Sequence, residues 1–375
     1  MSLTGRLTVD LDAIVANWRA LGRHAGGAEA AAVVKADAYG CGVAEVGLAL
    51  ARAGARTFFV AQPAEGAALR AALGEGPTIY VLAGFPVAVT AEARHRPPPA
   101  HPDGGGPRQE DAWTPGEQAR LLAEAALRPV LNAPEQIAAW REVGAGPAAL
   151  QLDTGMNRLG LERWELAALG PLPEEIALVM SHMACADDPA DPMNAGQLAE
   201  FRRLTEGLGV ARSLAATGGT LMGPDYAFDM VRPGVGLYGG LPFEGAARAV
   251  DLEVPILQVR EVAAGEAVGY GATWRARRPS RIATLSAGYA DGLHRLLSNR
   301  ARAFVDGVAC PFAGRVSMDL IGLDVTDASG ARAGAMVELL GPHQGVDRLA
   351  ADADTIGYEV LTALGRRYAR AHVGG

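Results

Sequence analysis

Five side chains with reactive or ionisable groups stand where buried strands are expected to end. They are Lys35, Arg158, His182, Thr217 and Arg232. Together they offer an amine, an imidazole, a hydroxyl and two guanidinium groups, which can move protons and bind anionic groups. Lys35 is the sharpest case because it follows the apolar run "AVV" and precedes Tyr39 by four residues. It is either a surface charge at a strand end or an amine held inside the protein for chemistry.

Each of these residues also has an ordinary structural interpretation. A lysine after a strand is usually a solvated charge, His182 alone could be a hydrogen-bonded wall residue, and Tyr39 could be a core aromatic. Arg158, in "LDTGMNRLG", could cap a helix or pair with Asp153.

Arg232 is less easily explained as a surface residue. It lies among apolar residues and glycines in "DMVRPGVGLYGG". An unpaired charge would be costly in such a setting. If all five side chains meet on one face, a shared site becomes the better explanation.

The elements that would bring them together are repeated βα units. Short β-branched runs alternate with longer Ala/Leu/Glu/Arg segments over the first two-thirds of the chain, which indicates a parallel sheet. The expected strands end near Lys35, Gln62, Leu82, Leu131, Asp153, His182, Thr217 and Tyr238. Helices are expected over 43–53, 64–73, 134–143 and 195–208. Eight strand ends predict a (β/α)8 TIM-type barrel, whose chemistry belongs at the carboxyl ends of the strands.

A second domain is expected after about residue 240. Runs such as "VPILQVREV", "RIATLSAGYA" and "MVELLG" are short and punctuated by turn residues, which predicts a mainly β-strand domain. Asp306-Gly307 is the expected hairpin turn. We therefore expect a barrel over 1–240 and a β domain over 241–375, with the first few residues as candidates for packing with the second domain. Residues 94–116 break the βα rhythm and predict a long exposed loop or a disordered insert.

Composition excludes several classes of function. The chain of 375 residues is 49% hydrophobic, 20% charged and carries a net charge of −8. That acidic balance argues against a nucleic-acid or anionic-membrane partner. The sequence shows no signal-peptide pattern and no apolar run long enough for a membrane span. Cys41, Cys185 and Cys310 form no CxxC pair, which favours a reducing cytoplasm over disulfides or a zinc or other metal site.

The motifs resemble those of alanine racemases in matching order across roughly the whole chain. They are "AVVKADAYG", "LDTGMNRLG", "FDMVRPGVGLYGG", "GYGATW", "SAGYADG", "GRVSMD" and "DTIGYE". The resemblance implies a barrel that binds pyridoxal 5′-phosphate (PLP), a β domain, and a cytoplasmic head-to-tail homodimer with shared active sites. It also implies an isomerase that interconverts L-alanine and D-alanine and supplies D-alanine for cell-wall peptidoglycan.

The resemblance assigns the two acid–base groups. Lys35 forms an imine with the PLP aldehyde and, once freed by substrate, serves as the base on the D side. Racemisation needs a second group on the opposite face, and the partner subunit's Tyr270 matches it on the L side. Because a phenol has a pKa of about 10, positive charge must favour its ionised form. His182 and Arg158 are the neighbours expected to supply that charge.

Arg232 matches the arginine that faces the pyridine nitrogen. Because a guanidinium does not give up its proton, it should leave that nitrogen unprotonated and weaken the ring as an electron sink. The resemblance thereby implies that transamination is suppressed.

The remaining assignments concern binding. The cofactor-binding group comprises Lys35, Tyr39, His182, Thr217, Gly218, Arg232, Gly234, Val235 and Tyr358. Substrate carboxylate recognition maps to Arg158 and to the backbone amide of Met318 from the other subunit. Tyr289 and Tyr358 match an inner channel gate, with Asp187, Arg295 and Arg315 further out. A narrow gate favours a small substrate such as alanine.

The sequence departs from the family pattern at several positions. Gln151 replaces a lysine, carbamylated in some members, that steadies the neighbouring arginine, so Arg158 must be oriented by neutral hydrogen bonds or an anion. Where the family commonly has Asn-Ser in its phosphate motif, this sequence has Ala216-Thr217, and the threonine keeps the hydroxyl. Ser317 stands where cysteine is frequent. The 94–116 segment has no matching role.

Three alternatives remain open from the sequence. A PLP-dependent decarboxylase would share Lys35 and the two-domain plan, although Arg232 and Tyr270 point away from it. A non-catalytic PLP-binding regulator would not need Tyr270 or the β domain. A broader-specificity or serine racemase would share the same chemistry.

Overall fold

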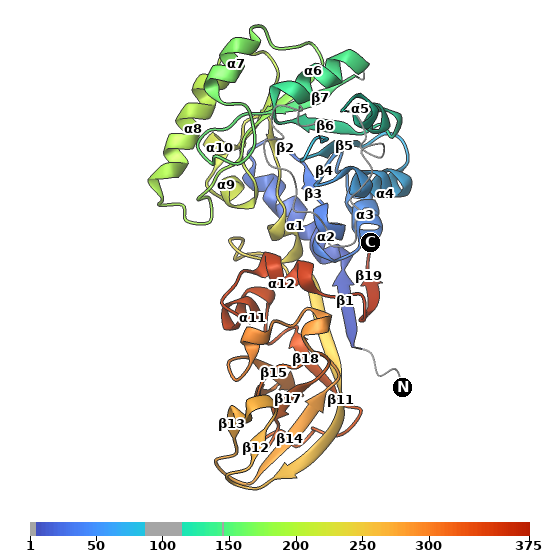
Figure 1. The fold of residues 1–375 in the computed structure, drawn as a ribbon, viewed down its shortest axis with the longest axis vertical. Helices are drawn as coiled ribbons and strands as arrows, with labels where there is room; N and C mark the ends of the chain where they lie inside the picture. Colours follow the sequence, from blue (N-terminus) through green and yellow to red (C-terminus); the bar gives the residue numbers. More distant parts are fainter. Residues whose placement is uncertain (1–4, 87–114, 145) are drawn as a thin grey trace, which may run out of the picture. The chain divides into compact units, whose positions relative to one another are not determined.

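The protein is described by a computed structural model that covers residues 5–86, 115–144 and 146–375. The chain divides into two compact units (Figure 1). The barrel unit comprises His24–Lys35 and Ala55–Arg232, and the β unit comprises Met1–Arg23, Ala36–Gly54 and Pro233–Gly375. Lys35 and Arg232 are therefore each the last residue of a barrel-unit segment.

The barrel unit is built on a seven-stranded parallel sheet, ordered as the strands follow in the chain. The strands are β3 (Ala32–Val33), β4 (Thr57–Val60), β5 (Thr78–Val81), β6 (Arg128–Leu131), β7 (Ala148–Gln151), β8 (Ile176–Met180) and β9 (Ala211–Ser213). Phe58, Phe59 and Val60 of β4 are fully buried. Successive buried residues are typical of a parallel sheet that is covered on both faces.

Backbone bonds close this sheet into a ring. The short strand β10 (Met230–Val231) pairs in parallel with β2 (Glu29–Ala30), which leads directly into β3. On its other side, the Arg232 amide donates to the Ala215 carbonyl at 2.8 Å. The seven strands and β10 thus occupy eight positions, and the predicted (β/α)8 barrel is confirmed.

The predicted eighth strand, ending near Tyr238, is wrong. That segment forms a 3-10 helix, η3 (Val235–Tyr238), and the true eighth strand ends at Val231. Pro233 has no backbone N–H for a sheet ladder, and Gly239 closes the segment with φ = +87°.

The helices of the barrel unit follow the strands. They are α4 (Pro63–Leu73), α5 (Pro115–Glu124), α6 (Pro134–Val143), α7 (Arg163–Leu169), α8 (Pro192–Thr205), α9 (Thr217–Leu221) and α10 (Pro224–Ala227). The predicted bounds of α6 are confirmed. The α8 helix begins three residues before the predicted start because Asp191 Oδ1 accepts from the Met193 amide at 2.8 Å and Pro192 suits the first turn.

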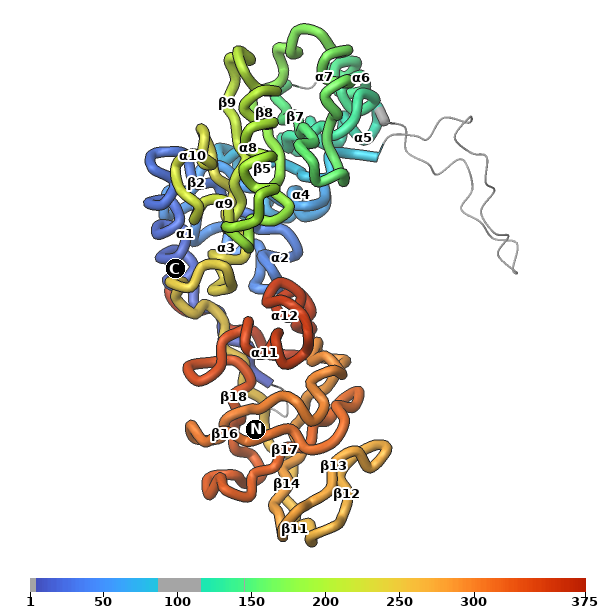
Figure 2. The backbone as a smooth tube through the Cα atoms, turned by 90° about the vertical axis from the view of Figure 1, so that its left-hand side faces the viewer, coloured from blue at the N-terminus to red at the C-terminus, as the bar shows by residue number. Residues whose placement is uncertain are grey.

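The β unit contains an eight-stranded sheet whose longest strand is β11 (Val250–Val262). Its other strands are β1 (Arg6–Asp10), β14 (Ser280–Leu285), β15 (Arg302–Val305), β16 (Val308–Pro311), β17 (Ile321–Asp324), β18 (Met336–Leu340) and β19 (Ala369–Val373). The β11 strand pairs with β1, β14 and β18. Figure 2 labels β11, β14 and β18 in the same part of the backbone tube. The amino-terminal β1 also pairs in parallel with β19.

Shorter elements complete the β unit. They are α1 (Leu11–His24, whose last residue belongs to the barrel unit), α3 (Val43–Arg52), β12 (Ala267–Val268), η4 (Tyr270–Ala272), β13 (Trp274–Arg275), η5 (Tyr289–Asp291), η6 (Arg295–Leu297), α11 (Val346–Asp352) and α12 (Gly357–Ala363). The helix α2 (Lys35–Tyr39) begins at the last residue of the barrel unit. The expected mainly β-strand content after residue 240 is confirmed.

The predicted hairpin at Asp306-Gly307 is confirmed, since β15 and β16 pair with Val305 opposite Val308. Both turn residues have positive φ, at 47° and 79°, as a two-residue hairpin turn requires. Of the predicted insert at 94–116, residues 94–114 lie outside the described residues and the last two begin α5. Among the described residues, no helix has the length and apolar character needed to cross a membrane.

Candidate active site

Lys35 lies half-buried at the end of the β3 segment. Burial lowers the pKa of its amine, and the nearby Arg158 cation lowers it further, while Glu65 acts in the opposite direction. None of the described residues accepts a hydrogen bond from this amine. Its neutral form is therefore favoured relative to an ordinary lysine, which suits a nucleophile or a base better than a surface charge.

Lys35 is also the only lysine in the chain. The 34 basic residues comprise this lysine and 33 arginines. A count by residue type would have given this signal from the sequence. Any attachment of an aldehyde to a lysine of this chain must therefore be at Lys35, and no second lysine can act as an acid or base.

The chain turns left-handed immediately after Lys35. Ala36, Asp37, Ala38 and Tyr39 have φ between 53° and 56°, although none is glycine. Such a conformation costs roughly 1–2 kcal/mol per residue. The Asp37 carboxylate accepts from the Val43 amide at 2.8 Å and so fixes the exit of the turn. Strain of this kind is typical of functional sites.

Arg232 is only 3% exposed, and its guanidinium donates to neutral acceptors. They are the Ser213 hydroxyl, the Ser181 carbonyl at 2.6 Å and the Leu214 carbonyl at 3.3 Å. Burial lowers the pKa of Arg232 to about 9, so the group stays charged at neutral pH. No carboxylate pairs with it among the described residues.

A buried polar network that the sequence did not predict supports these acceptors. The Ser181 hydroxyl donates to the Leu152 carbonyl and contacts the Thr154 hydroxyl, each at 2.8 Å. Gln197 donates to the Thr154 hydroxyl at 3.2 Å and to the His182 carbonyl at 3.0 Å. Serine, threonine and glutamine carry no pattern that marks them as partners, so only the fold identifies this network.

His182 is neutral near pH 7, contrary to its expected role as a source of positive charge. Burial, together with the nearby cations Arg232, Arg158 and Lys35, lowers its pKa to about 3. A histidine among three cations does not accept another proton readily. Of the two residues expected to supply charge, only Arg158 carries one.

Arg158 is exposed and does not pair with Asp153. The Asp153 carboxylate instead accepts from the Gly155 amide at 2.8 Å and the Asn157 amide at 3.2 Å. The Arg158 side chain has no hydrogen-bond or ion-pair partner in the described parts of the chain. Gln151 donates to the Leu159 carbonyl at 3.1 Å, so a neutral hydrogen bond fixes the backbone beside Arg158.

The residues expected to hold phosphate lie in both units. In the barrel unit, Thr217 and Gly218 begin α9, and a Cβ at Gly218 would lie 2.4 Å from the Ala186 carbonyl oxygen. In the β unit, the Tyr39 ring is 5% exposed, stacks on Tyr238 at a centroid distance of 4.6 Å, and lies 6.1 Å from the Tyr358 ring. Gly234 directly precedes η3, Val235 begins it, and both are buried.

Other predicted residues lie on the surface of the β unit. Tyr270 is 73% exposed and Met318 is 53% exposed. The Met318 carbonyl accepts from the Ala290 amide at 3.0 Å, whereas its own N–H has no acceptor among the described residues.

The expected gate residues are only partly brought together. The Tyr289 amide donates to the Ser317 carbonyl at 3.0 Å, next to Met318. A Cβ at Gly271 would lie 3.2 Å from the Arg315 guanidinium, so Arg315 packs beside the Tyr270 segment. Arg295 and Asp187 are exposed, and no described contact joins either to another predicted residue.

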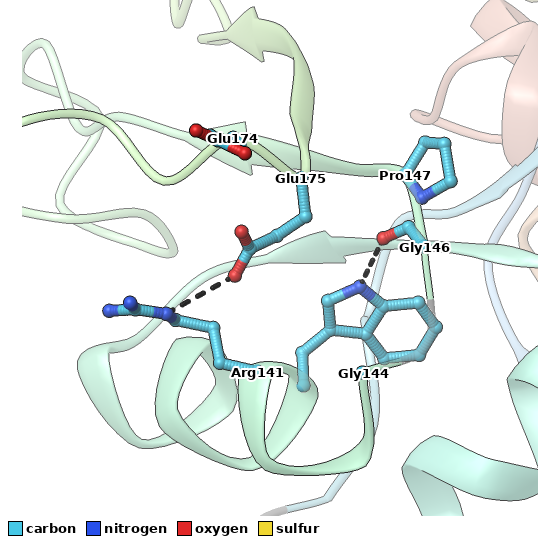
Figure 3. Close-up of a pocket in the computed structure, with 7 residues that line it drawn as sticks. Arg141, Gly144, Gly146, Pro147, Glu174 and Glu175 are labelled. Carbon is cyan, nitrogen blue, oxygen red and sulfur yellow. Dashed lines mark hydrogen bonds and ion pairs between the residues drawn. The ribbon is translucent and has the colours of Figure 1, made fainter.

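A separate hollow in the barrel unit is lined by Trp140, Arg141 and Glu175, among others (Figure 3). The Arg141 guanidinium pairs with Glu175 at 3.3 Å, and the Trp140 indole donates to the Gly146 carbonyl at 2.8 Å. No predicted site residue lines it. The Arg141–Glu175 ion pair and the Trp140–Gly146 bond tie up two of its polar side chains, and the hollow is separate from the predicted site residues.

The chain matches the two domains of one family. Residues 9–97 and 109–242 match "Alanine racemase, N-terminal domain", and residues 249–372 match "Alanine racemase, C-terminal domain". An alanine racemase from Jannaschia sp. is 51% identical over 369 residues, which cover 98% of each chain.

Solved structures agree with this match. The alanine racemase from Bartonella henselae "with covalently bound pyridoxal phosphate" is 38% identical with a TM-score of 0.86, and covers 99% of this chain and 100% of its own. A "biosynthetic alanine racemase" from Pseudomonas aeruginosa is 36% identical with a TM-score of 0.86, and covers 100% of both chains.

Proposed function

The chain belongs to the alanine racemase family, and on that premise we propose how its own residues interconvert L-alanine and D-alanine. The family match establishes the activity and the cofactor, PLP. The single observation that carries the site assignment is that the only lysine of the chain is half-buried beside a second cation, with the pKa of its amine lowered.

The residues present fit PLP. The neutral form of the Lys35 amine is favoured, and the buried Arg232 stays charged. Among the residues expected to bind phosphate, position 218 has no room for a side chain and is occupied by glycine. When bound, PLP withdraws electrons from the substrate Cα and so acidifies its proton. The protein must then attach the cofactor, orient the substrate and move one proton between two faces.

Lys35 is the attachment residue and the base on the D side. Its amine takes a proton only when neutral, and burial together with Arg158 favours that state. Arg158 binds the substrate carboxylate, since its guanidinium is charged, exposed and has no partner among the described residues. Gln151 holds the adjacent backbone through the Leu159 carbonyl.

Arg232 is the residue that would face the pyridine nitrogen of bound PLP, where its positive charge would limit electron withdrawal by the ring. Its three neutral acceptors hold the guanidinium in place without a carboxylate that could share a proton with that nitrogen. His182 is neutral because it is buried near the Arg232, Arg158 and Lys35 cations. It therefore lines the cofactor site and offers hydrogen bonds there, but it does not supply positive charge.

Tyr270 is the base on the L side and acts in the active site of a second copy. Two observations support this. Tyr270 is 73% exposed, and the Met318 amide has no acceptor among the described residues. A homodimer with shared sites would use both, with Met318 donating to the substrate carboxylate.

Tyr39, Thr217, Gly218, Gly234, Val235 and Tyr358 bind the phosphate, which needs donors and close backbone approach. Tyr289 and Tyr358 gate the access channel, with Asp187, Arg295 and Arg315 further out. A gate of this kind selects a small substrate.

The physiological role of the protein is to supply D-alanine for peptidoglycan, and the protein acts in the cytoplasm. Its domain boundary lies near residue 240, with the barrel before it and the β domain after it.

A panel of L-amino acids followed by chiral analysis tests the substrate. PLP-loaded protein should convert alanine to an equal D/L mixture and leave bulkier amino acids unchanged. Equal conversion of serine would indicate a broader-specificity enzyme, and release of carbon dioxide without inversion would indicate a decarboxylase. Bound PLP with no turnover of any amino acid would indicate a regulator.

A further inference from the structure

The carboxyl-terminal strand β19 holds two distant segments of the β unit through Arg370. Its Nε donates to the Gly40 carbonyl at 3.2 Å, and its NH2 group donates to the Leu364 carbonyl at 3.0 Å. A guanidinium presents several donors in one rigid plane, so it can bond two carbonyls at once and fix their relative positions. A lysine ammonium on its flexible stem would fix those positions less well.

Each of these carbonyls lies next to an expected phosphate ligand. Gly40 directly follows Tyr39, and Leu364 directly follows the last residue of α12, the helix that carries Tyr358. The two tyrosine rings lie 6.1 Å apart. A Cβ at Gly40 would lie 2.7 Å from the Leu361 carbonyl oxygen, so the turn and α12 are in close contact.

His372, two residues further along β19, holds the same turn. Its Nε2 lies 2.7 Å from the Cys41 carbonyl oxygen and donates to it. A Cβ at Gly42 would lie 2.9 Å from that nitrogen, which leaves little freedom between the strand and the turn. Because Ala36 to Tyr39 all have positive φ, the turn needs such outside contacts to persist.

We propose that Arg370, assisted by His372, is a positioning residue for the cofactor phosphate. It fixes the spacing between Tyr39 and Tyr358 by binding the backbone beside each. The proposal rests on the proposed function, which assigns both tyrosines to the phosphate. Neither Arg370 nor His372 touches the cofactor in this account, and their effect passes through the tyrosines.

The test compares two ligands of the full-length protein, PLP and pyridoxal, which lacks the phosphate. Arg370→Ala and Arg370→Lys should each weaken PLP binding by roughly tenfold, the lower end of what partners that orient a binding residue contribute. Pyridoxal binding should be unchanged. The 31P resonance of bound PLP should also shift in both variants. Arg366→Ala is the control, because Arg366 is exposed and has no partner among the described residues.

The outcomes separate this proposal from the proposed function. If Arg370→Ala does not fold, Arg370→Lys, which keeps the charge and most of the stem, and His372→Asn decide the question. Unchanged PLP binding in the folded variants would overturn the proposal, and so would an equal loss for PLP and pyridoxal, which indicates general packing. A wild-type protein that binds neither ligand would instead overturn the proposed function.

Discussion

The Arg232 guanidinium donates to the Ser181 carbonyl at 2.6 Å. This bond joins the end of β10 to the end of β8 in the barrel unit. The Ser181 hydroxyl is in turn held by Leu152 and Thr154. The charged group assigned to the pyridine nitrogen therefore rests on a chain of neutral hydrogen bonds.

Gln197 anchors that chain and should contribute to stability. It is 1% exposed and contacts Thr154, His182 and Ala184. Gln197→Ala should lower the free energy of unfolding by about 1–3 kcal/mol, because buried polar groups lose their partner. Arg202→Ala, in the same helix, removes an exposed ion pair with Asp225 and a 3.4 Å bond to the Asp225 carbonyl, and should change the free energy of unfolding by less than about 1 kcal/mol. Denaturant unfolding measures both, and equal effects would contradict a special role for Gln197.

PLP should attach to one peptide only. Reduction with borohydride makes the attachment permanent, and peptide mapping should then find the cofactor on the peptide that contains Lys35. Lys35→Arg should abolish both the labelling and the absorbance of attached cofactor. Because no other lysine exists in the chain, residual labelling of this variant would show that PLP attaches elsewhere.

The pH dependence of attachment should respond to two neighbours in opposite directions. Attachment needs the neutral amine, so its rate should rise with pH and should do so below the ordinary lysine pKa of about 10.4. Arg158→Gln removes a cation that lowers the Lys35 pKa, so the profile should move to higher pH. Glu65→Gln removes an anion that raises this pKa, so the profile should move to lower pH. Stopped-flow absorbance without substrate measures the rates, and shifts in the same direction would contradict the assignment.

Shared active sites predict complementation between inactive variants. Lys35→Ala and Tyr270→Phe should each lose most activity as pure proteins. Mixed in equal amounts under conditions that exchange subunits, they should regain up to about a quarter of wild-type activity. About half of the dimers are then mixed, and one of the two sites in each mixed dimer has both Lys35 and Tyr270. No recovery, despite exchange shown by mass-tagged subunits, would place both residues in one chain's own site.

The sequence predicted those features that short-range patterns determine. Buried β-branched runs indicated most barrel strands, and Pro134 marked the start of α6. The eighth strand was misplaced because the apolar run that ends at Tyr238 forms a 3-10 helix, while the strand itself is the two-residue β10 just before it. The left-handed turn after Lys35 could not be predicted because none of its four residues is glycine.

The site residues show the same division. Lys35, Arg158, Arg232 and Tyr270 stand in recognisable motifs, and their residue types suit the chemistry. The neutral state of His182 depends on burial and on cations that only folding brings close. Arg370 acts on Gly40, 330 residues away in the sequence, so no local pattern could reveal it.

The most direct measurement follows alanine from both enantiomers with PLP-loaded protein in deuterated water. Starting from pure L-alanine and from pure D-alanine, chiral chromatography should show the same final mixture of equal parts, since the two enantiomers have equal free energy. Mass spectrometry should show deuterium at Cα in the inverted product. If L-alanine or D-alanine keeps its starting configuration while PLP remains bound at Lys35, the proposed racemisation is contradicted.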